Sequence, residues 1–222
     1  MKRCTLLYAV FWFHCTLFLN GQIEAKPKSI LIHSTMHTDG GIKLKMSTST
    51  KEQKYLRASI HTPTKTAEAT LVYNGNLVSI TKESESHISS SILRGEEAAA
   101  NLFDLIALNP EYHFRDREAF DFKSLVFKGY RVELQNVADP IEGTERYRPY
   151  QLMLYEVDES GETLIRSIKY LSFFDAIDPY QQPKEIVFTD ESNGETGRIT
   201  IQKIEYNVGL PDFLFEIDDA PN

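Results

Sequence analysis

Cysteine is almost absent from the sequence, where only Cys4 and Cys15 occur among 222 residues. Two cysteines are too few for a disulfide-rich scaffold, which holds together small domains that lack a large core. A chain of this length can bury enough apolar surface to fold without such bridges. With 41% hydrophobic and 25% charged residues, the sequence indicates a globular protein that folds around an apolar core.

Positive charge is also scarce. The chain has 24 Lys and Arg residues against 32 Asp and Glu residues, which gives a formal net charge of −8. A nucleic-acid-binding protein needs a basic surface to replace the counterions of the phosphates. The composition therefore excludes that class, and we expect no nucleic-acid partner.

Motifs that bind nucleotides or metal ions are missing as well. No G-x-G-x-x-G, P-loop or EF-hand pattern occurs, and Ser89–Ser91 lack the G-x-S-x-G context of a nucleophilic serine. His33 and His37 are spaced like two metal ligands on a helix, but the threonines and glycines around them favour a strand or a turn. We predict no metal site and no cofactor.

One pair of residues remains as a catalytic candidate. His113 and Asp116 lie close together, and a histidine beside a carboxylate can act as a general base. The pair follows Pro110 in a charged connection, where polar residues are expected without any catalytic role. We predict that the protein is not an enzyme, with a hydrolase built on His113 and Asp116 as an alternative.

Only one long apolar run occurs, from Cys4 to Leu19, and it follows the basic start Met1-Lys2-Arg3. This pattern is typical of a secretory signal peptide, and the run is short for a membrane span of about 20 residues. We predict a signal peptide over residues 1–25, cleaved after Gly21 or Ala25, and an exported, periplasmic domain over residues 26–222. The alternative is an uncleaved segment that tethers the protein to the membrane.

Removal of that segment would change the character of the chain. Cleavage after Gly21 would take away both cysteines and two of the 24 basic residues, Lys2 and Arg3, so that the net charge would fall from −8 to −10.

Apolar and polar residues alternate with a period of two in most of the remaining chain, which is typical of strands with one buried face. Asn74-Gly75 stands between two such runs and is a strong hairpin signal. The alternation predicts strands over 42–46, 56–60, 69–73, 77–81, 125–127, 130–137, 150–157, 163–171, 184–189, 198–207 and 213–217.

Residues 95–108 break this pattern and predict an amphipathic helix. Ala99, Leu102 and Ile106 recur at helical spacing, acidic residues occupy the first turn, and Pro110 follows the end. The fold class is therefore mainly β with an inserted helix. We expect a single curved antiparallel sheet of about nine to eleven strands, with the helix on its concave face as a lid that opens and closes.

The C-terminal part carries a family resemblance. A strand led by Pro183, a hairpin at Asn193-Gly194, a strand that ends at Asn207 and a terminal Asp212–Phe215 follow one another in this order. Together with the hairpin over 152–170, this order resembles the outer-membrane lipoprotein-sorting (LolA/LolB-like) family. The resemblance implies a half-barrel sheet under a helical lid, with structural roles for Pro183, Gly194, Asn207, Asp212 and Phe215.

The resemblance also implies a function, that of a monomeric carrier whose hydrophobic cavity holds the acyl chains of lipoproteins or other lipids. Membrane-associated donor and acceptor proteins would be its partners. The candidate residues lining such a cavity are Leu44, Met46, Leu56, Ile60, Leu71, Leu102, Ile106, Leu152, Leu154, Ile186 and Phe188.

The alternation fits a second interpretation equally well, because a cavity and a solid core require the same pattern. In that case the protein is a non-catalytic exported interaction or sensor module with a filled core.

Overall fold

The computed structural model describes residues 27–52, 54–64, 67–84, 86–114, 125–139, 146–174 and 182–217. The predicted signal peptide over residues 1–25 and the catalytic candidate Asp116 lie outside the described residues. Among the residues that are described, no helix is long and apolar enough to cross a membrane.

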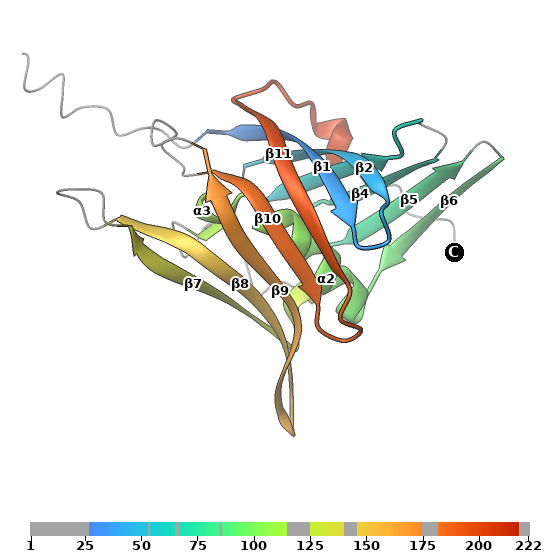
Figure 1. Ribbon diagram of the computed structural model, residues 1–222. Helices are drawn as coiled ribbons and strands as arrows, with labels where there is room; N and C mark the ends of the chain where they lie inside the picture. The colour runs from blue at the N-terminus through green and yellow to red at the C-terminus, as the bar shows by residue number, and fades with distance from the viewer. Residues whose placement is uncertain are drawn as a thin grey trace, which may run out of the picture.

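The fold is a single antiparallel sheet of eleven strands (Figure 1). Its spatial order is β6-β5-β4-β3-β2-β1-β11-β10-β9-β8-β7, so the sheet is open and β6 and β7 form its two edges. The strands are β1 (Ser29–Thr38), β2 (Lys43–Lys51), β3 (Tyr55–His61), β4 (Ala67–Tyr73), β5 (Val78–Ser84), β6 (His87–Leu93), β7 (Tyr130–Asp139), β8 (Arg146–Asp158), β9 (Gly161–Phe173), β10 (Pro183–Asp190) and β11 (Thr196–Tyr206).

The chain path explains where the helix lies. Strands β1 to β6 run outward from the centre to one edge, and strands β7 to β11 run inward from the other edge to pair with β1. Helix α2 (Gly95–Ala107) belongs to the connection between the two edges and lies within the curve of the sheet (Figure 1). The predicted fold class, a curved antiparallel sheet with an inserted helix, is confirmed.

The core lies between α2 and the concave face of the sheet. Leu102, Phe103 and Ile106 of α2 are fully buried, together with the residues from both halves of the sheet that they pack against. The Tyr170 hydroxyl of β9 donates a hydrogen bond to the carbonyl oxygen of Ala107 at 3.1 Å and ties the end of the helix to the sheet. The short helix α3 (Pro110–Phe114) begins at Pro110, which favours the first position of a helix.

The predicted hairpins are present. Tyr73 pairs with Val78 around Asn74-Gly75, and Asp158 pairs with Gly161 between β8 and β9. The side chain of Asn74 accepts hydrogen bonds from the amides of Asn76 and Leu77, at 3.1 Å and 2.9 Å. Gly75 has a φ of +91°, which glycine adopts without strain.

Two of the predicted strands are wrong. Residues 125–127 form the 3-10 helix η1 (Leu125–Phe127), and the segment predicted as a terminal strand contains the 3-10 helix η2 (Asp212–Phe215). Short apolar runs of three to five residues do not distinguish a strand from a helical turn. Strands β1 and β6 also belong to the sheet. β6 was not predicted, and for β1 the residues around His33 and His37 indicated only a strand or a turn.

Helix η2 docks the end of the described chain against the sheet. Phe215 is buried, with its ring centroid 5.9 Å from that of Tyr55. Lys51 pairs with Asp212, and Arg57 donates a hydrogen bond to the carbonyl oxygen of Leu214 at 3.1 Å. Asp212 and Phe215 therefore hold this end of the chain against β2 and β3.

Candidate ligand-binding site

Helix α2 fills much of the concave face where the sequence predicts a cavity. Eight of the eleven candidate lining residues belong to the buried core: Met46, Leu56, Leu71, Leu102, Ile106, Leu152, Leu154 and Ile186. Ile60 and Phe188 are partly buried against that core, and Leu44 is half-buried. Most of these side chains therefore pack against one another.

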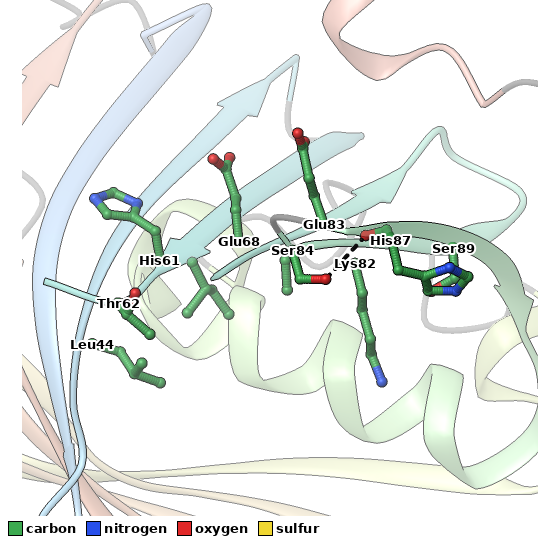
Figure 2. A pocket seen from close by; sticks show the side chains of 11 residues that line it. Leu44, His61, Thr62, Glu68, Lys82, Glu83, Ser84, His87 and Ser89 are labelled. Carbon is green, nitrogen blue, oxygen red and sulfur yellow. Dashed lines mark hydrogen bonds between the residues drawn. The ribbon is translucent and has the colours of Figure 1, made fainter. Parts of the chain in front are cut away.

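A pocket remains at one end of the sheet, and we call it the mouth pocket (Figure 2). Its volume is about 450 Å³, and it lies at the ends of β2 to β6, with no residue of α2 in its lining. Two of the predicted lining residues, Leu44 and Ile60, contribute to its wall. The complete lining is Leu44, Ile60, His61, Thr62, Glu68, Ala69, Lys82, Glu83, Ser84, His87 and Ser89.

Strand register explains why this part of the concave face is hollow. Ile60 pairs with Ala69, Ala69 pairs with Lys82, and Lys82 pairs with Ser89, so these four residues form one row across β3 to β6. Directly paired residues of neighbouring strands place their side chains on the same face. Because Ala69 and Ser89 have small side chains, the row leaves open space on both sides of Lys82.

The charged side chains at the pocket lie on opposite faces of the sheet. Leu44 and Lys82 point toward the side of the sheet on which α2 lies, whereas Glu68 and Glu83 point away from it (Figure 2). Glu68 and Glu83 are paired across β4 and β5, in the pair next to Ala69 and Lys82. Neighbouring pairs along two strands point to opposite faces of the sheet. The concave side of the pocket therefore combines apolar side chains with one lysine, while both carboxylates lie behind it.

A network of charged residues lies at the same end of the strands and fixes α2. Arg166 of β9 donates to Asp104 of α2 at 2.6 Å and to Asp190 of β10 at 2.9 Å. Within the described part of the chain, Asp104 Oδ1 is buried without a hydrogen-bond partner. This desolvation raises the pKa of Asp104 to about 6, although the charge of Arg166 opposes the shift.

The catalytic candidate His113 lies in the core and not in a cleft. Its side chain is 1% exposed, and burial lowers its pKa to about 3. The neighbouring Tyr112 ring packs edge-on against the His113 ring, with 5.4 Å between the ring centroids. The Tyr112 hydroxyl donates a hydrogen bond to the carbonyl oxygen of Pro27 at 2.8 Å. A neutral histidine in such surroundings is a packing residue, because a general base at neutral pH needs access to substrate and a pKa nearer 7.

The histidine pair at the N-terminal side lies on a strand, one of the two structures that its neighbours favour. His33 and His37 belong to β1, and His33 contacts the Ser47 hydroxyl at 3.1 Å and Glu205 at 3.4 Å. In the residues that the structure covers, no group of three or more His, Cys, Asp or Glu side chains is placed to hold a metal ion.

Ala69, Lys82, Ser84, His87 and Ser89 line the pocket but were not predicted as residues of a site. One signal was available for Lys82, since it continues the alternation of Val78 and Ile80, which face the core. A lysine in a core-facing position at the end of a strand indicates that the core ends there.

Comparisons with known proteins identify the fold. No protein-family model and no curated protein matches the sequence. Among solved structures, the chain is similar to a LolA superfamily protein from Nitrosomonas europaea, with a TM-score of 0.50 and 16% identity over 92% of this chain and 97% of the other.

Two further solved structures are similar in shape. One is a Vibrio parahaemolyticus domain assigned to outer membrane lipoprotein sorting, with a TM-score of 0.48, 10% identity and coverage of 86% of this chain and 90% of that one. The other is a DUF1329 family protein from Desulfovibrio piger, with a TM-score of 0.47, 13% identity and coverage of 94% and 96%. The structural neighbours thus include LolA superfamily proteins, and the similarity to the Nitrosomonas protein confirms the predicted LolA-like fold.

Proposed function

We propose that the protein is a non-catalytic carrier that holds acyl chains of lipoproteins or other lipids in the mouth pocket. The observation that carries this proposal is an open pocket of about 450 Å³ with Leu44 and Ile60 in its wall, on the concave face of a LolA-like sheet. Binding sites for small molecules commonly have volumes of about 300–1,000 Å³.

Such a function needs no reaction. An acyl chain gains roughly 25 cal/mol for each Å² of apolar surface that leaves water, and each buried methylene contributes about 0.8 kcal/mol. Side chains at the ends of β2 to β6, including Leu44, Ile60 and Ala69, provide apolar surface for part of one chain. The carrier would therefore bind a single chain by burial and release it without chemistry.

The same proposal includes a cellular location and binding partners for the protein. We place it in the periplasm, exported by the segment over residues 1–25, with lipids or acylated proteins as cargo. Membrane-associated donor and acceptor proteins would load and unload it as a monomer. An acidic protein is repelled by anionic membrane surfaces, which would favour release from the bilayer over retention.

Displacement of a neutral fluorescent probe tests the proposal. Purified protein is mixed with N-phenyl-1-naphthylamine, and the bound probe is displaced by a lipopeptide with acyl chains or by the same peptide without them. We expect displacement by the acylated peptide only. Ile60→Asp should reduce probe binding because it places a charge in the pocket wall.

Ile88→Asp is the matched control. Ile88 lies on β6 and is 65% exposed, but it does not line the pocket. The control should bind the probe like the unaltered protein. Absence of probe binding, or an equal loss in both variants, would contradict the carrier function.

The second candidate function is an interaction or sensor module with a filled core. The packing of eight predicted lining residues into one core with α2 favours it. In that case the protein would bind neither probe nor lipopeptide, and native mass spectrometry of protein purified from the periplasm would give the mass of the bare polypeptide.

A further inference from the structure

We infer that the mouth pocket selects amphiphiles with an anionic headgroup, and that Lys82 is the residue that binds this headgroup. The inference rests on the proposed function, since it assumes that an apolar chain enters the pocket. It adds the chemical class of the ligand, a single acyl chain that carries a carboxylate or a phosphate.

Lys82 lies near the end of β5 on the face of the sheet that is turned to the core. Val78 and Ile80 of β5 face the core, and side chains two residues apart on a strand share a face, so Lys82 continues the core-facing row. Figure 2 shows its side chain on the α2 side of the sheet together with Leu44. A lysine at such a position adds an ammonium group to a pocket that Leu44 and Ile60 also line.

Among the described residues, no carboxylate lies within ion-pair distance of the Lys82 ammonium group. Arg166, at the same end of the strands, is already paired with Asp104 and Asp190. Lys82 is thus a cation on this part of the concave face whose charge is still available to a ligand.

The neighbours of Lys82 decide what kind of ligand fits. Its paired neighbours Ala69 and Ser89 are small, and the Ser89 hydroxyl can donate a hydrogen bond to an anionic oxygen. The Ser84 hydroxyl already donates to the carbonyl oxygen of His87 at 3.3 Å (Figure 2). Leu44 and Ile60 offer apolar contact on the other side of the pocket. An apolar wall together with a cation and a hydroxyl donor matches an acyl chain with an anionic end.

The overall charge of −8 does not oppose this binding. Exposed charges are screened beyond about 8–10 Å at ordinary salt concentrations, so the nearest groups dominate. The two carboxylates that line the pocket, Glu68 and Glu83, point to the opposite face of the sheet (Figure 2). The headgroup would therefore meet Lys82 first.

Three ligands with the same acyl chain test the inference: myristate, myristoyl-lysophosphatidylglycerol and the neutral monomyristoylglycerol. The affinity of each ligand is measured by titrating it into a complex of the protein with N-phenyl-1-naphthylamine at neutral pH and following displacement of the probe. We expect one or both anionic ligands to bind about tenfold more tightly than the neutral one, because a hydrogen bond to a charged group stabilises a complex more than one between neutral groups. The anionic ligand that is preferred distinguishes a carboxylate from a phosphate headgroup.

Variants of Lys82 complete the experiment. Lys82→Gln should abolish the preference and leave the neutral ligand unaffected, whereas Lys82→Arg should retain the preference. Lys45→Gln is the matched control, because Lys45 is an exposed lysine of β2 that does not line the pocket. Raising the salt concentration from about 50 mM to about 500 mM should weaken the preference through screening.

Failure of the inference and failure of the carrier function would give different experimental results. Equal binding of all three ligands by the unaltered protein, or an anionic preference that survives Lys82→Gln, would overturn the inference and leave the carrier function intact. If none of the three ligands displaces the probe, the carrier function fails and the inference fails with it.

Discussion

Phe188 and Gly197 face each other across β10 and β11, and the aromatic ring occupies the space that a side chain would need. A Cβ atom on Gly197 would lie 2.2 Å from the Phe188 ring, much closer than two carbon atoms can approach. We predict that Gly197→Ala lowers the free energy of unfolding by about 1–3 kcal/mol, the usual effect of overpacking a core. Urea-induced unfolding followed by circular dichroism would measure the change.

Two further variants identify the cause. Gly209→Ala is the matched control, because no atom lies within 4 Å of a Cβ at that position. It should change the free energy of unfolding by less than about 0.5 kcal/mol. The double variant Gly197→Ala with Phe188→Leu should recover part of the loss, and a loss that is the same with either residue at position 188 would refute the steric explanation.

His113 predicts a dependence of stability on pH. Burial lowers its pKa to about 3 in the folded protein, whereas an unfolded histidine has a pKa of 6.5. Between these values the unfolded state binds a proton that the folded state does not. The free energy of unfolding should therefore fall as the pH drops below about 6.5, by up to about 1.4 kcal/mol per pH unit.

A comparison of variants separates this effect from that of Asp104. The pKa of Asp104 is raised to about 6, so the folded state binds the extra proton between pH 3.8 and 6, and its contribution has the opposite sign. Urea unfolding of the unaltered protein and of His113→Gln between pH 4 and pH 7 isolates the histidine, because Asp104 contributes to both. Equal slopes in the two proteins would show that His113 is not a buried neutral histidine.

At the scale of elements, α2 contributes to the stability of the fold, whereas the wall of the mouth pocket contributes to ligand binding. Leu102 of α2 is fully buried, so Leu102→Ala should lower the free energy of unfolding by about 2–5 kcal/mol. Leu44 lies in the pocket wall and is only half-buried. Leu44→Ala should therefore cost little stability but weaken binding of an acyl ligand about fivefold, which corresponds to about 1 kcal/mol of lost apolar contact.

Denaturant unfolding and probe displacement on the same two variants test this separation. The folded fraction of Leu102→Ala should bind the ligand with unchanged affinity. If instead Leu102→Ala abolishes binding in protein that is still folded, the ligand contacts α2, and the site lies deeper than the mouth pocket.

Elements with a strong periodic pattern could be predicted from the sequence. The amphipathic helix and the hairpins of β4–β5, β8–β9 and β10–β11 follow directly from spacing and from turn residues such as Asn74-Gly75. Strand β6 has the sequence HISSSIL, whose serines hide the alternation because the edge strand needs few apolar residues. Helices η1 and η2 were predicted as strands because a run of three apolar residues has no measurable period.

The site was predictable only in part. Leu44 and Ile60 belong to apolar alternation and were therefore among the candidate lining residues. Lys82, Ala69 and Ser89 form the hollow because strand register brings them into one row, and register depends on pairings between distant residues. The sequence also does not show how far α2 extends over the sheet, which determines where packing ends and the pocket begins.

The whole molecule depends on α2 because it is part of the connection that joins the two edges of the sheet. Nine residues at and near it are buried: Ala98, Ala99, Ala100, Leu102, Phe103, Leu105, Ile106, Ala107 and Leu108. Arg166 also binds Asp104 of this helix to the sheet. Moving α2 away would expose the core that both halves of the sheet share, so its opening should cost nearly as much free energy as global unfolding.

We therefore predict that ligand enters the mouth pocket while α2 stays in place, in contrast to the moving lid expected from the sequence. Hydrogen–deuterium exchange with and without myristate measures this. Amides at the pocket ends of β3, β5 and β6 should exchange more slowly when ligand is bound, and those of residues 95–107 should keep their slow exchange. Faster exchange in α2 on binding would show that the helix opens, and the apolar surface available to a ligand would then extend from the mouth pocket into the core.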